Sequence, residues 1–140
     1  MIFWDTSALV RCYSKNEPGH GRAANILASK ERQSGSVILL PEATTALARM
    51  AGKNRALRDK VLRDVRSALA EFDLLPADIA QAELAARFGV EYGLRGADAL
   101  HVAAGFLLAR ELGRGVRFVT SDLHQASAAR SEKLRVILVN

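Results

Sequence analysis

The sequence predicts an α/β fold in which a central parallel β-sheet carries helices on both faces. Short apolar runs alternate along the chain with longer segments of helical periodicity, which is the pattern of strand–helix–strand units. No repeat, low-complexity tract or linker interrupts the 140 residues. That length suits one hydrophobic core, so we expect a single domain over residues 1–140.

In the first part of the chain, turn residues separate the expected elements. Pro18 and Gly19 break the helical pattern that follows the first apolar run, and Gly35 precedes the second run. Pro41 fits the first turn of a helix, because its missing N–H group would be unpaired there, and Gly52 ends that helix. We expect strands over 1–4 and 37–40 and helices over 6–13, 21–30 and 41–50.

Helical periodicity is strongest in the second part of the chain. Apolar side chains recur at helical spacing from Leu57 to Phe72, with basic residues on the opposite face. Asp78 can cap the next helix, and the segment from Ala97 to Leu112 is apolar nearly all round, so it should be the most buried helix. We expect helices over 56–71, 78–88, 97–112 and 123–130 and strands over 74–76, 117–120 and 136–139.

The composition is that of a soluble globular protein, with 49% hydrophobic and 25% charged residues. No apolar stretch reaches the ~20 residues that a membrane span needs, and the N-terminus lacks the basic region and cleavage site of a signal peptide. We therefore expect a cytoplasmic protein with no membrane association. Cys12 is the only cysteine, which excludes an intrachain disulfide and a thiolate metal site.

Positive charge is concentrated in one segment. Residues 49–66 hold seven Lys or Arg and two Asp, a local excess equal to the net charge of the whole chain, +5. Such a segment can be a solvated helix face, but beside an acidic metal site it favours contacts with nucleic-acid phosphates. The residues we expect to contact nucleic-acid phosphates are Arg49, Lys53, Arg55, Arg58 and Arg63.

Three acidic residues, Asp5, Glu42 and Asp122, lie where strand patterns give way to helix patterns, and a fourth, Asp98, opens a helix after Gly93 and Gly96. The carboxyl ends of parallel strands share one edge of the sheet, so acids from separate segments would meet there. Gathered carboxylates repel one another unless a cation neutralises them, and all-oxygen ligands suit Mg²⁺ or Mn²⁺. Taken singly, each acid could instead cap a helix N-terminus. Together they predict a metal site.

Four motifs occur in a fixed order along nearly the whole chain. They are Asp5-Thr6-Ser7, Glu42, the segment RGADALHVAA over 95–104, and Thr120-Ser121-Asp122. This ordered set resembles the PIN-domain ribonucleases, particularly the VapC toxins of bacterial and archaeal toxin–antitoxin pairs. The resemblance implies that Asp5, Glu42, Asp98 and Asp122 hold one or two Mg²⁺ or Mn²⁺ ions. It also implies supporting roles for the hydroxyl groups of Ser7 and Thr120.

The same resemblance implies an activity and partners. The activity is RNA endonuclease chemistry that leaves 5′-phosphate and 3′-hydroxyl ends, with the metal activating water. The implied partners are RNA of the tRNA or rRNA class, a cognate antitoxin and a second copy of the chain. For the antitoxin we expect a cation inserted among the acids and an apolar anchor around Leu9, Ile26 and Leu27. Because metal chemistry supplies the base, His101 and His124 are assigned packing or surface roles.

Other functions fit the sequence less well. A receiver domain needs two adjacent acids after its first strand, and a haloacid-dehalogenase-type phosphatase needs an acid where Ser7 stands. Two alternatives stay open: a PIN-like module that binds RNA or protein without cutting, and a free-standing RNA-processing nuclease. Loss of a central acid would indicate the binding module, but Asp5, Glu42 and Asp98 are all present.

Overall fold

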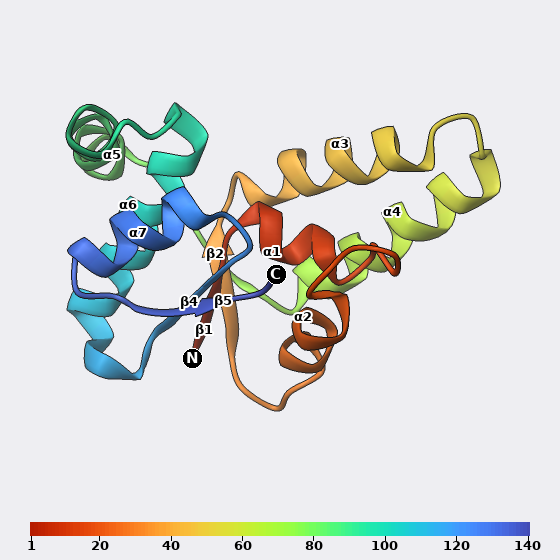
Figure 1. Cartoon of the computed structure of the whole chain (residues 1–140), viewed down its shortest axis with the longest axis horizontal. Coiled ribbons are helices and arrows are strands. Elements are labelled where there is room, and N and C mark those ends of the chain that lie inside the picture. The colour runs from red at the N-terminus through yellow and green to blue at the C-terminus, as the bar shows by residue number, and fades with distance from the viewer.

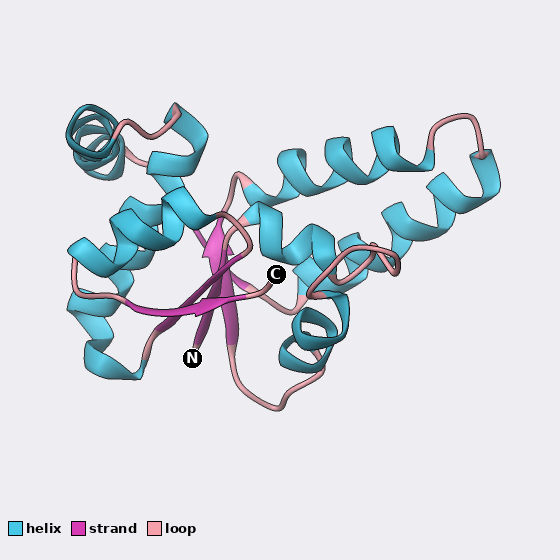
Figure 2. Cartoon of the chain, viewed as in Figure 1, coloured by secondary structure: helices cyan, strands magenta, loops and turns pink.

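Five short parallel strands form the centre of the molecule, in the order β3-β2-β1-β4-β5 (Figure 2). The computed structural model describes residues 1–140, apart from the side chain of Arg114. The strands are β1 Ile2–Trp4, β2 Gln33–Ser36, β3 Asp73–Leu75, β4 Arg117–Thr120 and β5 Arg135–Leu138. The all-parallel sheet confirms the predicted fold class.

Helices cover both faces of this sheet, as predicted (Figure 1). One face carries α1 Thr6–Arg11, α2 His20–Leu27, α3 Leu39–Ala51 and α4 Arg55–Ala70. The other carries α5 Ile79–Tyr92, α6 Gly96–Leu112 and α7 Leu123–Ser131, with a 3₁₀ turn at Gly113–Gly115. Strand side chains alternate between the faces, so Phe3 packs with α5 to α7 while Ile2 and Trp4 pack with α1 to α4. The fold therefore has two separate cores.

The predicted strand at 37–40 was wrong, because β2 lies four residues earlier. Leu39 begins α3 and packs on the strand: a Cβ atom added to Gly35 would lie 2.1 Å from Leu39 Cδ1. Gln33 and Ser34 can occupy the buried strand because their side chains form hydrogen bonds, whereas Ser36 Oγ is buried with no partner among the described residues. Gln33 Oε1 accepts a bond from Trp4 Nε1 at 2.7 Å, and Ser34 Oγ donates to the carbonyl of Ile2 at 2.9 Å.

Helices α3 and α4 form a long antiparallel hairpin that extends away from the sheet (Figure 1). Gly52 follows α3 with φ 56°, a left-handed value that favours glycine, and Asn54 caps α4 by accepting a bond from the N–H of Leu57. The predicted basic segment occupies this hairpin.

The prediction that the apolar helix is the most buried one is confirmed. Seven residues of α6 are buried, more than in any other helix among the described residues. Within that part of the chain, no helix is both long and apolar enough to cross a membrane.

Candidate active site

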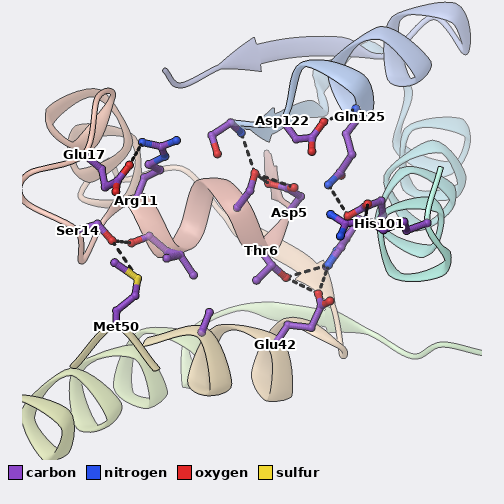
Figure 3. Close-up of a pocket in the computed structure, with 16 residues that line it drawn as sticks. Asp5, Thr6, Arg11, Ser14, Glu17, Glu42, Met50, His101, Asp122 and Gln125 are labelled. Atoms are coloured by element: carbon purple, nitrogen blue, oxygen red, sulfur yellow. Dashed lines mark hydrogen bonds and ion pairs between the residues drawn. The ribbon is translucent and has the colours of Figure 1, made fainter. Parts of the chain in front are cut away.

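All four predicted acids line one cavity of about 400 Å³ at the carboxyl edge of the sheet (Figure 3). They come from four separate segments. Asp5 follows β1, Glu42 lies in the first turn of α3, Asp98 lies in the first turn of α6, and Asp122 follows β4. The crossovers of a parallel sheet thus bring together residues that are far apart in sequence.

Asp5 is fully buried at the floor of this site. It caps α1, because its Oδ1 accepts a bond from the N–H of Ala8 at 3.0 Å. Ser7 Oγ lies 2.9 and 3.0 Å from the two carboxylate oxygens. Burial nevertheless raises the pKa of Asp5 above its ordinary value, since the charged form is desolvated. A nearby cation would offset that cost.

The hydroxyl groups of Ser7 and Thr120 connect Asp5 to the segment after β4. Ser7 Oγ accepts a bond from the N–H of Ser121 at 3.0 Å, and it lies 3.4 Å from Thr120 Oγ1. Thr120 Oγ1 in turn accepts from the N–H of Asp122 at 3.0 Å. These bonds connect both hydroxyl groups to the segments that carry Asp5 and Asp122.

Glu42 is held through one oxygen. Its Oε2 accepts bonds from Thr6 Oγ1 at 2.6 Å and from His101 Nε2 at 2.7 Å. The bond from His101, together with that from Thr6, lowers the pKa of Glu42 despite partial burial. The other oxygen, Oε1, takes no hydrogen bond from the described residues.

His101 is a site residue that the sequence interpretation missed. Its buried ring reaches from α6 across the pocket to Glu42 and also lies 3.0 Å from Thr6 Oγ1. Nδ1 is buried with no hydrogen-bond partner among the described residues. Because Nε2 faces the carboxylate of Glu42, this nitrogen carries a hydrogen and donates it. The three-residue spacing from Asp98 was the available signal, since it places both side chains on one helix face.

Gln125 and Arg95, which were not predicted, hold Asp98. Gln125 Nε2 donates to Asp98 Oδ1 at 3.0 Å, and Arg95 Nε donates to Oδ2 at 3.2 Å.

Asp122 caps α7, because its Oδ1 accepts from the N–H groups of His124 and Gln125 at 2.7 and 2.9 Å. Asp122 therefore both caps a helix and lines the pocket, as Asp5 does.

The opposite end of the pocket carries an ion pair (Figure 3). Arg11 Nη1 donates to Glu17 Oε2 at 2.7 Å and to the carbonyl of Pro18 at 3.0 Å. Val10 and Met50 add apolar surface beside it. The pocket thus has a carboxylate end and a mixed end that presents a guanidinium group.

The donor chemistry of the carboxylate end fits Mg²⁺ or Mn²⁺, because the available ligands are hard oxygen atoms. As the side chains stand, no three His, Cys, Asp or Glu among the described residues are grouped closely enough to hold a metal ion. Mg²⁺ is usually bound by one or two carboxylates together with several water molecules, so this spacing still allows an ion in the pocket.

The predicted RNA-binding residues lie outside this pocket. Arg49, Lys53, Arg55 and Arg63 are exposed and Arg58 is half-buried, and none of the five forms an ion pair within the described part of the chain. Arg49 and Arg58 line a shallow hollow between α3 and α4. The structure therefore separates the basic residues from the acids.

The expected apolar anchor for a partner was wrong at Leu9, which is fully buried. Ile26 and Leu27 are half-buried and pack against the core on the α1 to α4 side. A groove of about 300 Å³ with accessible apolar surface lies between the segment after α1 and the α3–α4 hairpin. Its apolar lining is Tyr13, Leu47, Met50, Ala51, Leu57 and Val61.

Comparison with known proteins gives a family match and a set of shared folds. The family model described as PIN domain matches residues 2–131. No curated protein matches the chain in sequence.

Three solved structures illustrate the shared fold. VapC20 of Mycobacterium tuberculosis, described as a sarcin–ricin loop cleaving toxin, is 22% identical with a TM-score of 0.69, covering 91% of this chain and 95% of that one. A toxin–antitoxin complex from Klebsiella pneumoniae is 18% identical with a TM-score of 0.67, covering 100% and 98%. VapBC2 of Rickettsia felis, bound to a DNA fragment from its promoter, is 16% identical with a TM-score of 0.66, covering all of both chains.

Proposed function

This chain belongs to the PIN domain family, and on that premise we propose that it is a divalent-metal-dependent endoribonuclease and the toxin of a toxin–antitoxin pair. One observation carries the proposal: carboxylates from four separate segments line a single pocket at the carboxyl edge of the sheet. Helix capping accounts for Asp5 and Asp122 but not for Glu42 or Asp98, because neither of these caps its helix.

The residues that would hold the ion are Asp5, Glu42, Asp98 and Asp122. A bound Mg²⁺ or Mn²⁺ would lower the pKa of water and offset negative charge on the phosphodiester. Thr6 and His101 hold Glu42 through Oε2 and leave Oε1 for a ligand. Ser7 orients the buried Asp5 carboxylate. In the hydrolysis, a water oxygen bonds to phosphorus while the bond to the 3′ oxygen breaks, which gives 5′-phosphate and 3′-hydroxyl ends.

The charge distribution suits a polyanionic substrate, and we propose that this substrate is RNA. Arg11 lines the mixed end of the pocket, and Arg95 lines it beside Asp98, so both can contact phosphates near the scissile bond. The basic residues of the α3–α4 hairpin would contact more distant phosphates. We propose structured RNA of the tRNA or rRNA class, in keeping with the mycobacterial relative described as cleaving the sarcin–ricin loop.

An antitoxin is the proposed inhibitory partner. The apolar groove beside Met50 adjoins the acidic pocket, since Ser14, Glu17 and Met50 line both. A partner helix seated in the groove could therefore place a Lys or Arg among the acids. A homodimer, also expected from the family resemblance, stays a prediction that light scattering can check.

Brief induction of the protein in cells, with and without the product of the neighbouring gene, tests this function. We expect growth arrest and new RNA 5′ ends at defined sites from the wild-type protein alone. Coexpression should restore growth, and Asp98→Asn should produce neither effect. If the wild-type protein alone is harmless and no neighbouring gene product copurifies, the toxin assignment fails. A free-standing RNA-processing nuclease or a non-cutting binding module would then be the better account.

A further inference from the structure

A buried glutamine, Gln125, joins two of the acids in the pocket. Its backbone N–H donates to Asp122 Oδ1 at 2.9 Å, and its side-chain Nε2 donates to Asp98 Oδ1 at 3.0 Å. The residue is only 3% exposed and lies on α7, whereas Asp98 lies on α6. The side-chain bond therefore fixes Asp98 relative to α7, the helix that Asp122 caps.

The side chain of Gln125 is unfavourable for the stability of the fold at this buried position. The rest of the buried face of α7 is formed by Ala126, Ala128 and Ala129. Gln125 Oε1 is buried there and has no hydrogen-bond partner among the described residues. An unpaired buried carbonyl is unfavourable, and an apolar side chain of similar length would avoid the penalty. A side chain chosen for packing alone would not be glutamine.

The hydrogen bond to Asp98 explains why glutamine occupies this position. A carboxylate oxygen needs a donor, and the reverse orientation of the amide would set Oε1 against it. The other partner of Asp98, Arg95, is 87% exposed at its side chain, so its attraction is screened by solvent. Gln125 is therefore the stronger constraint on the direction of the Asp98 carboxylate.

We infer that Gln125 is a positioning residue of the metal site, which orients Asp98 for ion binding and acts only through that carboxylate. The inference rests on the proposed function. Residues that hydrogen-bond metal ligands commonly change metal affinity by roughly 10- to 100-fold when they are replaced. Replacing the Gln125 side chain leaves its backbone bond to Asp122 in place, so the substitution isolates the effect on Asp98.

The test measures Mn²⁺ dissociation constants by calorimetry and the Tm of the metal-free protein in chelator. Gln125→Met should weaken Mn²⁺ binding about 10-fold or more, while Tm holds or rises because the unpaired carbonyl is gone. In an Asp98→Asn background, Gln125→Met should cause no further loss, since both changes remove the same oriented carboxylate. Gln125→Ala, which matches the neighbouring alanines, provides a second variant if the methionine disturbs packing.

Gln81 provides the matched control. It is also a buried glutamine, and its Nε2 donates to the carbonyl of Leu100 at 3.2 Å, but it does not line the pocket. Gln81→Met should lower Tm and leave Mn²⁺ affinity unchanged.

The outcomes separate this inference from the proposed function. Wild-type Mn²⁺ affinity in both Gln125 variants overturns the positioning role alone, as does an additive loss in the Asp98→Asn background. A lower Tm with unchanged Mn²⁺ affinity would make Gln125 a structural link between α6 and α7. A wild-type protein that binds no Mn²⁺ would overturn both the inference and the metal-dependent function on which it rests.

Discussion

His101 on α6 donates a hydrogen bond from Nε2 to Oε2 of Glu42 on α3, at 2.7 Å. The two helices lie on opposite faces of the sheet, so this bond joins the two halves of the molecule at the pocket. Thr6 donates to the same oxygen at 2.6 Å, so two side chains from separate elements hold Glu42.

The first prediction concerns this pair of donors. Thr6→Val removes one donor at nearly constant volume, so the metal-free protein should lose about 1 kcal/mol of unfolding free energy. The pKa of Glu42 is lowered from its ordinary value of 4.5. The stability it contributes is therefore present above pH 4.5 and is lost as pH falls through the lowered folded pKa.

Urea titrations of the metal-free protein from neutral to acidic pH measure the effect. The difference between wild type and Thr6→Val should shrink as Glu42 becomes protonated, and Thr6→Ser should restore wild-type behaviour. A difference independent of pH would show that the hydroxyl does not act through Glu42.

The second prediction concerns Asp5, whose pKa is shifted in the opposite direction to that of Glu42. Burial raises the pKa of Asp5 above its ordinary value of 3.8, so its contribution favours folding below pH 3.8 and is lost as pH rises through the raised folded pKa. Asp5→Asn should therefore stabilise the metal-free protein at neutral pH, by about 1 to 3 kcal/mol. It should also flatten the pH dependence of stability.

Thermal unfolding in chelator and in Mn²⁺ separates the two consequences of Asp5→Asn. The variant should have the higher Tm in chelator and gain less from Mn²⁺ than the wild-type protein, because ligand binding stabilises only the protein that can bind. A lower Tm of the variant in chelator would show that Asp5 serves mainly to cap α1.

The third prediction concerns the basic hairpin. Replacing Arg55, Arg58 and Arg63 with Ala should weaken RNA binding across sequences and reduce the slope of log affinity against log salt by about 2, as three lost phosphate contacts require. Removing Arg22, Lys30 and Arg130 provides a control of equal charge from outside α3 and α4. Filter binding at several salt concentrations gives both slopes. Equal slopes for the two triple variants would make the hairpin a solvated surface.

The fourth prediction tests the apolar groove. Met50 and Leu57 are 52% and 45% exposed, so Met50→Glu with Leu57→Glu should leave the fold intact and prevent copurification of the antitoxin. Ile79→Glu on α5 is the control, because Ile79 is 76% exposed and lies outside the groove. Undiminished copurification of the double variant would place the partner on another surface.

Much of the site could be predicted because strand ends in a parallel sheet share an edge. Asp5 and Asp122 follow the strands that the sequence predicts, and Glu42 and Asp98 open helices. The position of β2 could not be predicted from polarity. Its buried polar residues depend on partners in β1, such as Trp4 for Gln33, that no local pattern reveals.

The roles of His101 and Gln125 could not be predicted from the sequence either. His101 and Gln125 bond to acids on other helices, so their roles depend on how α6 lies against α3 and α7. The spacing of residues in the sequence predicts which helix face each side chain lies on, but not which element packs against that face. Tertiary packing determines the partner.

Cleavage of RNA by the purified protein, with the end groups of the products identified, tests the central claim most directly. The wild-type protein should be inactive in chelator, recover when Mg²⁺ or Mn²⁺ is restored, and leave 5′-phosphate and 3′-hydroxyl ends, while Asp98→Asn should lose at least about 100-fold in rate. Full activity in chelator, 2′,3′-cyclic phosphate ends, or wild-type rates from Asp98→Asn would contradict a metal-dependent nuclease built on these four carboxylates.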